Sequence, residues 1–323
     1  MCTRVFWNDN GRLLIVGRTM DWPESTEPIL TVFPRGSHHD GGVLEGHRII
    51  EKNAVEWDAK YGSLVVTVYG LGAVDGMNEA GLAAHMLFLP ETDFGRHDPD
   101  KPAIHGGMWA QYLLDNAATV SEALCLMADL QLVMVEARGR KATVHLALED
   151  ANGDSAIIEY VDGKKTVHQG ARYQVMTNSP TYDEQLRLLS ELDFSHPSSD
   201  MPLPGNVNAV DRFARASYFL AMLPEPANER EGVASVLSII RNCSVPFGAP
   251  YKDVGIYNTE YRTVVDITNK RYFFELSTLP NVVWTDLGDL DFSKGSGVRL
   301  LDPDDLALSG DVTGKYESAA APY

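Results

Sequence analysis

The chain has 323 residues, a formal net charge of −18 and three cysteines. This length can bury a large core, while the negative charge opposes binding to nucleic-acid phosphates or anionic membrane surfaces, and no stretch approaches the ~18 apolar residues that span a bilayer. We therefore expect a soluble protein with no nucleic-acid or membrane partner, and the sparse cysteines favour a reducing compartment over a disulfide scaffold.

The first predicted elements are two strands at residues 3–7 and 13–19, which flank a turn signal at 8–11 and form a hairpin. Strands and helices then follow without regular alternation, which favours antiparallel sheets with helices packed outside over a doubly wound parallel sheet. Further strands are predicted at 29–33, 64–69, 82–89, 143–148, 155–160, 173–176, 262–267, 272–276 and 282–284. Helices are predicted at 102–117, from 119 onward, and at 182–189, 211–223 and 231–241.

Three histidines, His38, His39 and His47, lie in a predicted polar loop. Their spacing does not match that of a zinc site, so we expect solvated side chains and no metal. No glycine pattern resembles a phosphate loop or a dinucleotide turn, which predicts no nucleotide cofactor.

Four other features complete the pattern. Residues 75–81 read as a turn, and Cys125 falls inside a helical pattern, where plain core packing is expected. A loop at 196–208, rich in serine and proline, is the best candidate for a lid or for the subunit contact of a homo-oligomer. The acidic tail from 286 onward is predicted to be solvated surface.

Cys2 is the candidate nucleophile, because removal of Met1 would give it both a thiol and a free α-amine. An α-amine titrates near ~7.7 to 8.0 and a thiol near ~8.5, so the amine can take the proton of the thiol. The hairpin returns Arg18 and Asp21 to Cys2, and a break in the strand at Trp22-Pro23 is expected to turn both side chains toward the thiol. Arg18 would favour the thiolate, and Asp21 would hold the protonated amine. The alternative is a small buried cysteine beside an exposed ion pair.

Five short motifs occur together along the chain: Met1-Cys2-Thr3, Gly17 to Asp21, Asp75 to Leu82, Met176 to Asp183, and Leu203-Pro204-Gly205 followed by Arg212-Phe213. With these motifs in this order, the sequence resembles the choloylglycine hydrolase family, the N-terminal-nucleophile group that contains bile salt hydrolases and penicillin V acylases. The resemblance implies one domain over residues 1–323 with an α+β fold, a four-layer αββα sandwich of antiparallel sheets. It also implies hydrolysis of a linear amide C–N bond in a small-molecule N-acyl substrate, without a cofactor.

The same resemblance assigns roles to five residues. Cys2 matches the nucleophile, and Arg18 and Asp21 match the residues that contact its thiol and amine. Asn178 matches an asparagine that orients the amine and the tetrahedral intermediate, and Arg212 matches the distant arginine of the site. We expect an N–H of Asn178 and a backbone N–H to hold the oxyanion, although Asn178 could also be an ordinary turn cap.

Phe88 marks a departure from bile salt hydrolases, which have an asparagine in its place. This change and a short loop between Glu191 and Leu203 resemble the Gram-negative branch, whose members resemble penicillin V acylases and N-acyl homoserine lactone acylases. Trp22 and Phe88 are candidates for the walls of an apolar acyl pocket, with core packing as the alternative. A conjugated bile salt hydrolase and a catalytically silent ligand-binding protein are the other functions considered.

The start of the chain bears on localisation. Because the sequence begins directly at Met1-Cys2, we expect the protein to stay in the cytoplasm. A sequence trimmed to its mature start would look the same and would belong in the periplasm.

Overall fold

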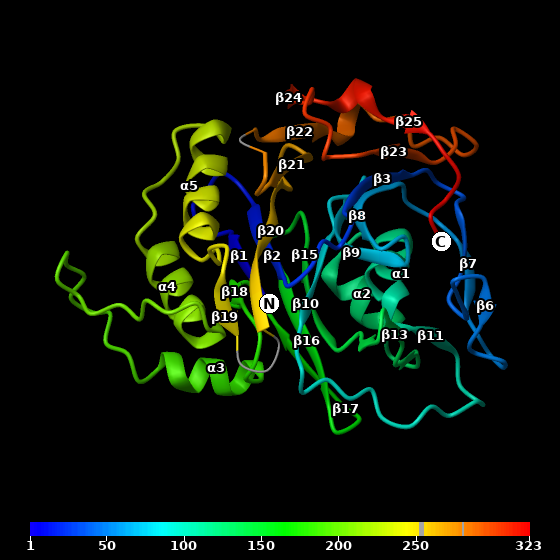
Figure 1. Cartoon of the computed structure of the whole chain (residues 1–323), viewed down its shortest axis with the longest axis horizontal. Helices are drawn as coiled ribbons and strands as arrows, with labels where there is room; N and C mark the ends of the chain where they lie inside the picture. The colour runs from blue at the N-terminus through cyan, green and yellow to red at the C-terminus, as the bar shows by residue number, and fades with distance from the viewer. Residues whose placement is uncertain (252–254, 280) are drawn as a thin grey trace.

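The computed structural model describes residues 1–251, 255–279 and 281–323, and two large β-sheets form its centre (Figure 1). The strands of the first sheet lie in the order β18 (Val175–Met176), β1 (Cys2–Trp7), β2 (Ile15–Trp22), β20 (Gly255–Asp266), β21 (Arg271–Leu276), β22 (Val283–Asp286) and β24 (Gly310–Asp311). The short strand β19 (Ala249–Tyr251) pairs with β20. The strands of the second sheet lie in the order β17 (Lys164–Gln169), β16 (Ser155–Val161), β15 (Val144–Glu149), β10 (Ala83–Phe88), β9 (Gly72–Asn78), β8 (Ser63–Val68), β3 (Ile29–Phe33), β23 (Arg299–Leu301) and β25 (Glu317–Ser318). Neighbouring strands are antiparallel in both sheets, apart from the parallel pair β22 and β24.

Short strand pairs form separate two-stranded sheets beside the two large ones: β4 (His38–Asp40) with β7 (Glu56–Asp58), β5 (Val43–Leu44) with β6 (His47–Arg48), β11 (Ala103–His105) with β12 (Gln131–Val133), and β13 (Glu136–Ala137) with β14 (Arg140–Lys141). The helices are α1 (Trp109–Asn116), α2 (Val120–Leu126), α3 (Tyr182–Leu189), α4 (Ala209–Ala221) and α5 (Glu229–Asn242), with 3-10 turns at Gly106–Met108, Leu287–Asp289 and Thr313–Lys315. Among the described residues, no helix has the length and apolar character required to cross a membrane.

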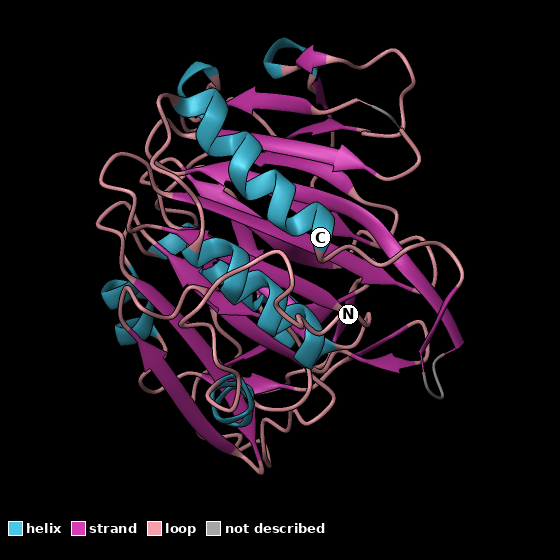
Figure 2. Ribbon diagram, turned by 90° about the vertical axis from the view of Figure 1, so that its left-hand side faces the viewer, coloured by secondary structure: helices cyan, strands magenta, loops and turns pink. Residues whose placement is uncertain are grey.

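The helices cover the outer faces of the two sheets and complete the predicted four-layer αββα sandwich. Helices α4 and α5 pack on β1, β2 and β20 of the first sheet, and α1 packs on β9 and β10 of the second, with α2 against α1. Figure 2 shows the molecule from the side of α4 and α5, with helices lying in front of the strands. Gly17 permits the close approach of α5, because a Cβ atom there would lie 2.6 Å from Cγ1 of Val236.

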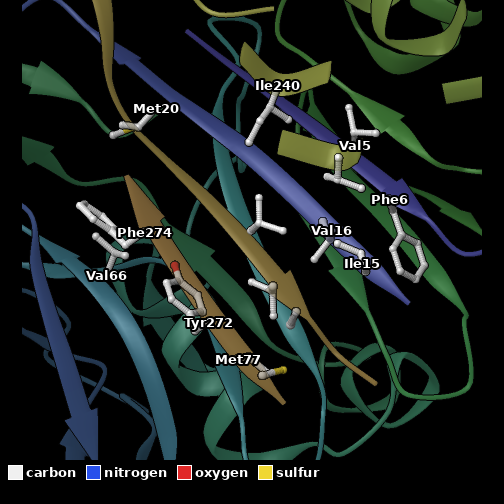
Figure 3. Close-up of a cluster of buried hydrophobic side chains, with 14 of the residues drawn as sticks. Val5, Phe6, Ile15, Val16, Met20, Val66, Met77, Ile240, Tyr272 and Phe274 are labelled. Carbon is white, nitrogen blue, oxygen red and sulfur yellow. The ribbon is translucent and has the colours of Figure 1, made fainter. Parts of the chain in front are cut away.

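Alternation along the strands divides the core into layers. Val66 of β8 and Phe274 of the first sheet belong to the larger cluster, which fills the space between the sheets and continues under α4 and α5; Figure 3 shows both side chains. Val65, the neighbour of Val66, points the other way, into the cluster under α1 and α2. Because successive residues of a strand face opposite sides, a strand that is buried on both faces needs an uninterrupted apolar run.

Two segments differ from the predicted elements. Residues 75–81 are not a single turn, because β9 continues to Asn78, whose Oδ1 then accepts the N–H groups of the next residues and closes the turn at 79–82. The predicted helix at 102–117 begins only at Trp109. The strand β11 and a 3-10 turn precede it, in keeping with the low helix propensity of Gly106-Gly107.

Burial corrects three further expectations. His39 is not solvated: it is 3% exposed and packs on Phe33 and Trp57. Cys125 is exposed and not core, because it lies on the outer side of α2. The acidic tail is more than solvated surface, since β23 and β25 extend the second sheet and β24 extends the first.

Candidate active site

The predicted hairpin is confirmed, and it places Cys2 at the start of β1, directly opposite Met20 of β2. The Cys2 thiol is 2% exposed and lies 3.2 Å from Nη2 of Arg18 and 3.7 Å from Sδ of Met20. Arg18 is completely buried, and it also donates to the carbonyl oxygen of Val74 on the second sheet. The thiol therefore faces the space between the two sheets.

The charge of Arg18 is secured by its surroundings. Burial alone would lower the pKa of this guanidinium, but its interactions with Cys2, Tyr261 and Asp75 together raise it. A permanent cation therefore lies 3.2 Å from the Cys2 sulfur. This contact is the one that the sequence predicted for Arg18.

Asn178 and Arg212 surround the backbone of Cys2. The backbone N–H of Cys2 and Nη2 of Arg212 both donate to Oδ1 of Asn178, at 2.7 and 2.8 Å. Nη1 of Arg212 also donates to Thr3 Oγ1 and to the Cys2 carbonyl oxygen. Because a guanidinium can only donate, this contact fixes which end of the Asn178 amide carries the nitrogen. That nitrogen donates one hydrogen to the carbonyl oxygen of Phe88, at 2.6 Å, and its second hydrogen has no acceptor among the residues that the structure describes.

Asp21 lies on the other face of the first sheet from Arg18. Its carboxylate accepts the hydroxyls of Thr259 and Thr19, at 2.6 and 3.2 Å, and lies 3.8 Å from Nη1 of Arg212. The expectation that Arg18 and Asp21 both face the thiol is therefore wrong. Arg18 adjoins the sulfur, whereas Asp21 belongs to the group around the backbone of Cys2.

The reason for this correction is that β2 does not break before Pro23. It continues through Trp22, and the irregularity is a β-bulge in which Met20 pairs with Tyr261 and Asp21 with Thr259. The extra residue is on β20, so the alternation of side chains along β2 is preserved.

Met1 covers the nitrogen of Cys2. Its side chain is 5% exposed and belongs to a small cluster with Val245 and Tyr257. Its carbonyl oxygen accepts the N–H of Asp21 at 2.7 Å, and its amine donates to the carbonyl oxygen of the same residue. Burial lowers the pKa of this amine, while the charges at Cys2 and Asp21 oppose the effect. An amine in this place is therefore held in a largely dry environment.

Two neighbouring cavities share part of their lining, and the first of them is lined by Cys2. The residues common to both are Trp22, Phe88, Arg140, Lys141 and Thr143. The first, of about 140 Å³, is lined by Cys2 and by mainly apolar side chains from both the strands and the nearby loops, among them Met20, Trp22, Val68, Leu71, Val74, Met86, Phe88, Val135 and Val144. The second, of about 290 Å³, is lined by Met1, Trp22, Pro23, Phe88, Arg140, Lys141, Thr143 and Tyr257. The rings of Trp22 and Phe88 make an edge contact at 5.6 Å and border both cavities.

Sequence reasoning missed a group of buried charges behind Arg18. Asp75 lies 3.4 Å from Nε of Arg18, and His85 and Glu149 continue the group into the second sheet. Asp75 stands in one of the motifs, but its interpretation as a turn residue concealed its charge contact. Among the described residues, no three histidine, cysteine, aspartate or glutamate side chains come together as a metal site.

Comparison with known proteins identifies the family of this chain. The family model of linear amide C–N hydrolases, choloylglycine hydrolase family, matches residues 2–305. The chain belongs to this family. It is accordingly a linear amide C–N hydrolase with the N-terminal nucleophile hydrolase fold.

Similar proteins include penicillin V acylases from two bacteria. The enzyme of Pectobacterium atrosepticum is 38% identical over 348 aligned residues, which cover 98% of this chain and 90% of that protein. The structure of the penicillin V acylase from Agrobacterium tumefaciens has a TM-score of 0.88 and 41% identity, covering 99% of this chain and 98% of that one. These sources agree with the predicted Gram-negative branch. A conjugated bile acid hydrolase from Clostridium perfringens shares the fold, with a TM-score of 0.78 and 20% identity over 93% of this chain and 96% of that one.

Proposed function

We propose that this chain hydrolyses N-acyl amides whose acyl part is apolar and ring-sized, as in penicillin V, with Cys2 as the nucleophile after Met1 is removed. The observation that carries the proposal is the apolar cavity of about 140 Å³ that opens on the Cys2 thiol. An engineered apolar cavity of ~150 Å³ binds benzene, so the size suits an aromatic ring. The similarity to two penicillin V acylases supports the same substrate class.

The direction of the substrate follows from the position of the Cys2 nitrogen. The amine must protonate the leaving nitrogen, so the leaving group has to lie beside it. The space beside it is the cavity that Met1 now borders, which leaves the apolar cavity for the acyl group. Trp22 and Phe88, which border both cavities, would then flank the scissile amide.

The leaving-group cavity has a positive wall. Arg140 and Lys141 line it and also border the apolar cavity, and among the described residues neither is engaged in an ion pair. A cationic wall favours a leaving group that carries a carboxylate, such as the bicyclic amine released from penicillin V. It offers less to the uncharged lactone of an acyl homoserine lactone, the second substrate class considered.

The reaction uses the groups around Cys2. The Cys2 amine takes the proton of the thiol, and the sulfur attacks the amide carbon. The carbonyl oxygen becomes negatively charged and accepts a hydrogen bond from the second N–H of the Asn178 amide. The C–N bond breaks as the Cys2 ammonium gives its proton to the leaving nitrogen. Water then attacks the thioester while the same amine takes a proton from it, which releases the acid and restores the thiol. In this scheme Arg212 and Asp21 hold Asn178 and the backbone of Cys2 in place.

Two other functions are distinguished by the size of the cavity and by turnover. A four-ring steroid needs several times the space of one aromatic ring, which counts against conjugated bile salts as substrates. A silent binding protein would be stabilised by ligands without releasing product.

The test combines intact-mass analysis with a substrate panel. We expect a mature mass without Met1, and turnover of penicillin V that is faster than that of acyl homoserine lactones and of glycocholate. Cys2→Ala should abolish turnover, whereas Cys125→Ala, which changes the exposed cysteine, should retain it. Persistent hydrolysis by Cys2→Ala would refute the role of Cys2, and faster turnover of glycocholate would refute the proposed substrate class.

A further inference from the structure

Five charged side chains form a continuous chain between the two sheets, behind the Cys2 thiol. Arg18 Nε lies 3.4 Å from Asp75 Oδ2, and the same oxygen lies 3.2 Å from Nδ1 of His85. On its other side, Nε2 of His85 lies 3.1 Å from Glu149 Oε2, and Glu149 pairs with Arg4. All five side chains are completely buried, and their charges alternate when His85 is protonated.

A buried carboxylate is tolerated only when it is paired, because removing a charge from water is strongly unfavourable. His85 stands between Asp75 and Glu149, with one ring nitrogen toward each. Neither ring nitrogen meets the geometry of a hydrogen bond, so the two contacts are electrostatic. A positive charge on the ring is attracted by both carboxylates at once, whereas a neutral ring leaves two buried negative charges facing it without compensation from the ring. The position of the ring between the two carboxylates therefore favours its charged form.

The other neighbours hold this chain in place. Tyr272 and Thr263 donate their hydroxyls to Asp75, at 2.7 and 3.0 Å. The groups around His85 thus come from both sheets: Asp75 on β9 and Glu149 on β15 contact it, while Arg18, Arg4 and Tyr272 lie one contact further away.

We propose that His85 is a positioning residue for the nucleophile: as an imidazolium it shares the charge of Asp75, so that Arg18 keeps its own positive charge available for the Cys2 sulfur 3.2 Å away. This inference rests on the proposed role of Cys2. If the ring were neutral, Arg18 would be the only cation beside Asp75, and the field at the sulfur would be less positive.

The electrostatics of the pair are consistent with this arrangement. Burial alone would lower the pKa of His85, but Glu149 and Asp75 together raise it to about 9. Burial would likewise raise the pKa of Asp75, but His85 and Arg18 together lower it. Both groups are therefore charged at neutral pH.

The test measures alkylation of Cys2 by iodoacetamide against pH, read at the Cys2 peptide by mass spectrometry, in wild type and in His85→Gln. We expect the midpoint of alkylation to rise by roughly half a pH unit, and kcat/KM below that midpoint to fall about threefold at unchanged KM. The control is His39→Gln. Burial, and to a smaller extent the charge of His38, lowers the pKa of His39 to about 4, so this ring is neutral over the pH range of the alkylation experiment. The control should leave the alkylation profile unchanged.

Alkylation needs no substrate, so it separates this inference from the proposed function. A folded His85→Gln protein with the wild-type alkylation profile would overturn the inference even if penicillin V is hydrolysed. Should His85→Gln fail to fold, the side-chain ¹⁵N shifts of His85 in the wild type decide the matter. Two protonated ring nitrogens at pH 7 are expected, and a neutral ring at that pH would overturn the inference.

Discussion

Replacement of Arg212 by methionine should both destabilise the protein and slow hydrolysis. Arg212 is completely buried, and its guanidinium donates to the backbone of Val207 and Cys2 and to the side chains of Thr3 and Asn178. Methionine keeps much of the volume of the side chain but none of these donors. The acceptors are left in a dry environment, and Asp21 loses the cation at 3.8 Å.

The magnitude follows from these contacts. A hydrogen bond to a charged group contributes about 1.5 to 3 kcal/mol, and loss of one partner of a buried ion pair costs about 3 to 5 kcal/mol. These effects overlap, because the same cation supplies both. We therefore expect the free energy of unfolding to fall by about 3 to 5 kcal/mol in Arg212→Met. Without the contact from Arg212, the side-chain amide of Asn178 would no longer be held with its nitrogen toward the oxyanion. We therefore expect kcat to fall by about 10²-fold or more.

Urea unfolding and penicillin V kinetics measure the two effects. Arg212→Lys is the matched variant: it keeps the charge, but a compact ammonium cannot bridge four acceptors, so stability should recover more than kcat. Adding Asp21→Asn to Arg212→Met should restore part of the lost stability, because the unpaired carboxylate is removed. A free energy of unfolding for Arg212→Met within about 1 kcal/mol of the wild-type value would refute the assigned contacts.

Three further predictions concern pH and specificity. The pKa of His85 is about 9 in the folded protein and ~6.5 in an unfolded chain, so its stabilisation is complete below pH ~6.5 and lost as pH rises through 9. Urea midpoints should fall over that range in wild type but not in His85→Gln, and equal declines would contradict the shift. Met86→Phe should fill part of the apolar cavity beside Cys2 and lower kcat/KM for phenoxyacetyl substrates about tenfold relative to acetyl substrates. An unchanged ratio of the two kcat/KM values would mean that the acyl group binds elsewhere. Arg140→Ala with Lys141→Ala should raise KM for penicillin V about fivefold or more and leave KM for neutral acyl homoserine lactones unchanged. Equal changes in KM for the two substrates would mean that the cations do not recognise the carboxylate of penicillin V.

The local elements were predictable because each has a local cause. The turn at 8–11 and the flanking β-branched residues produce the hairpin, and the apolar stripes produce α3 and α5 close to their expected bounds. The hairpin alone brings Arg18 back to Cys2, so that contact could be read from the chain. Failures occurred where local signals competed, as at Gly106-Gly107 before α1.

The face on which each side chain acts was decided only by the tertiary structure. Whether Asp21 faces the thiol depends on which strand carries the bulge, and β20 carries it 238 residues further along the chain. The ion-pair chain through His85 likewise forms only when the two sheets stack, because its members come from strands that are distant in sequence. The amino-acid sequence by itself determines the hairpin and the alternating faces, since these follow from neighbouring residues, and it predicts Cys2 as the attacking group. Burial, charge pairing and the shape of the acyl cavity depend on contacts between layers, and so only the packed sandwich determines them.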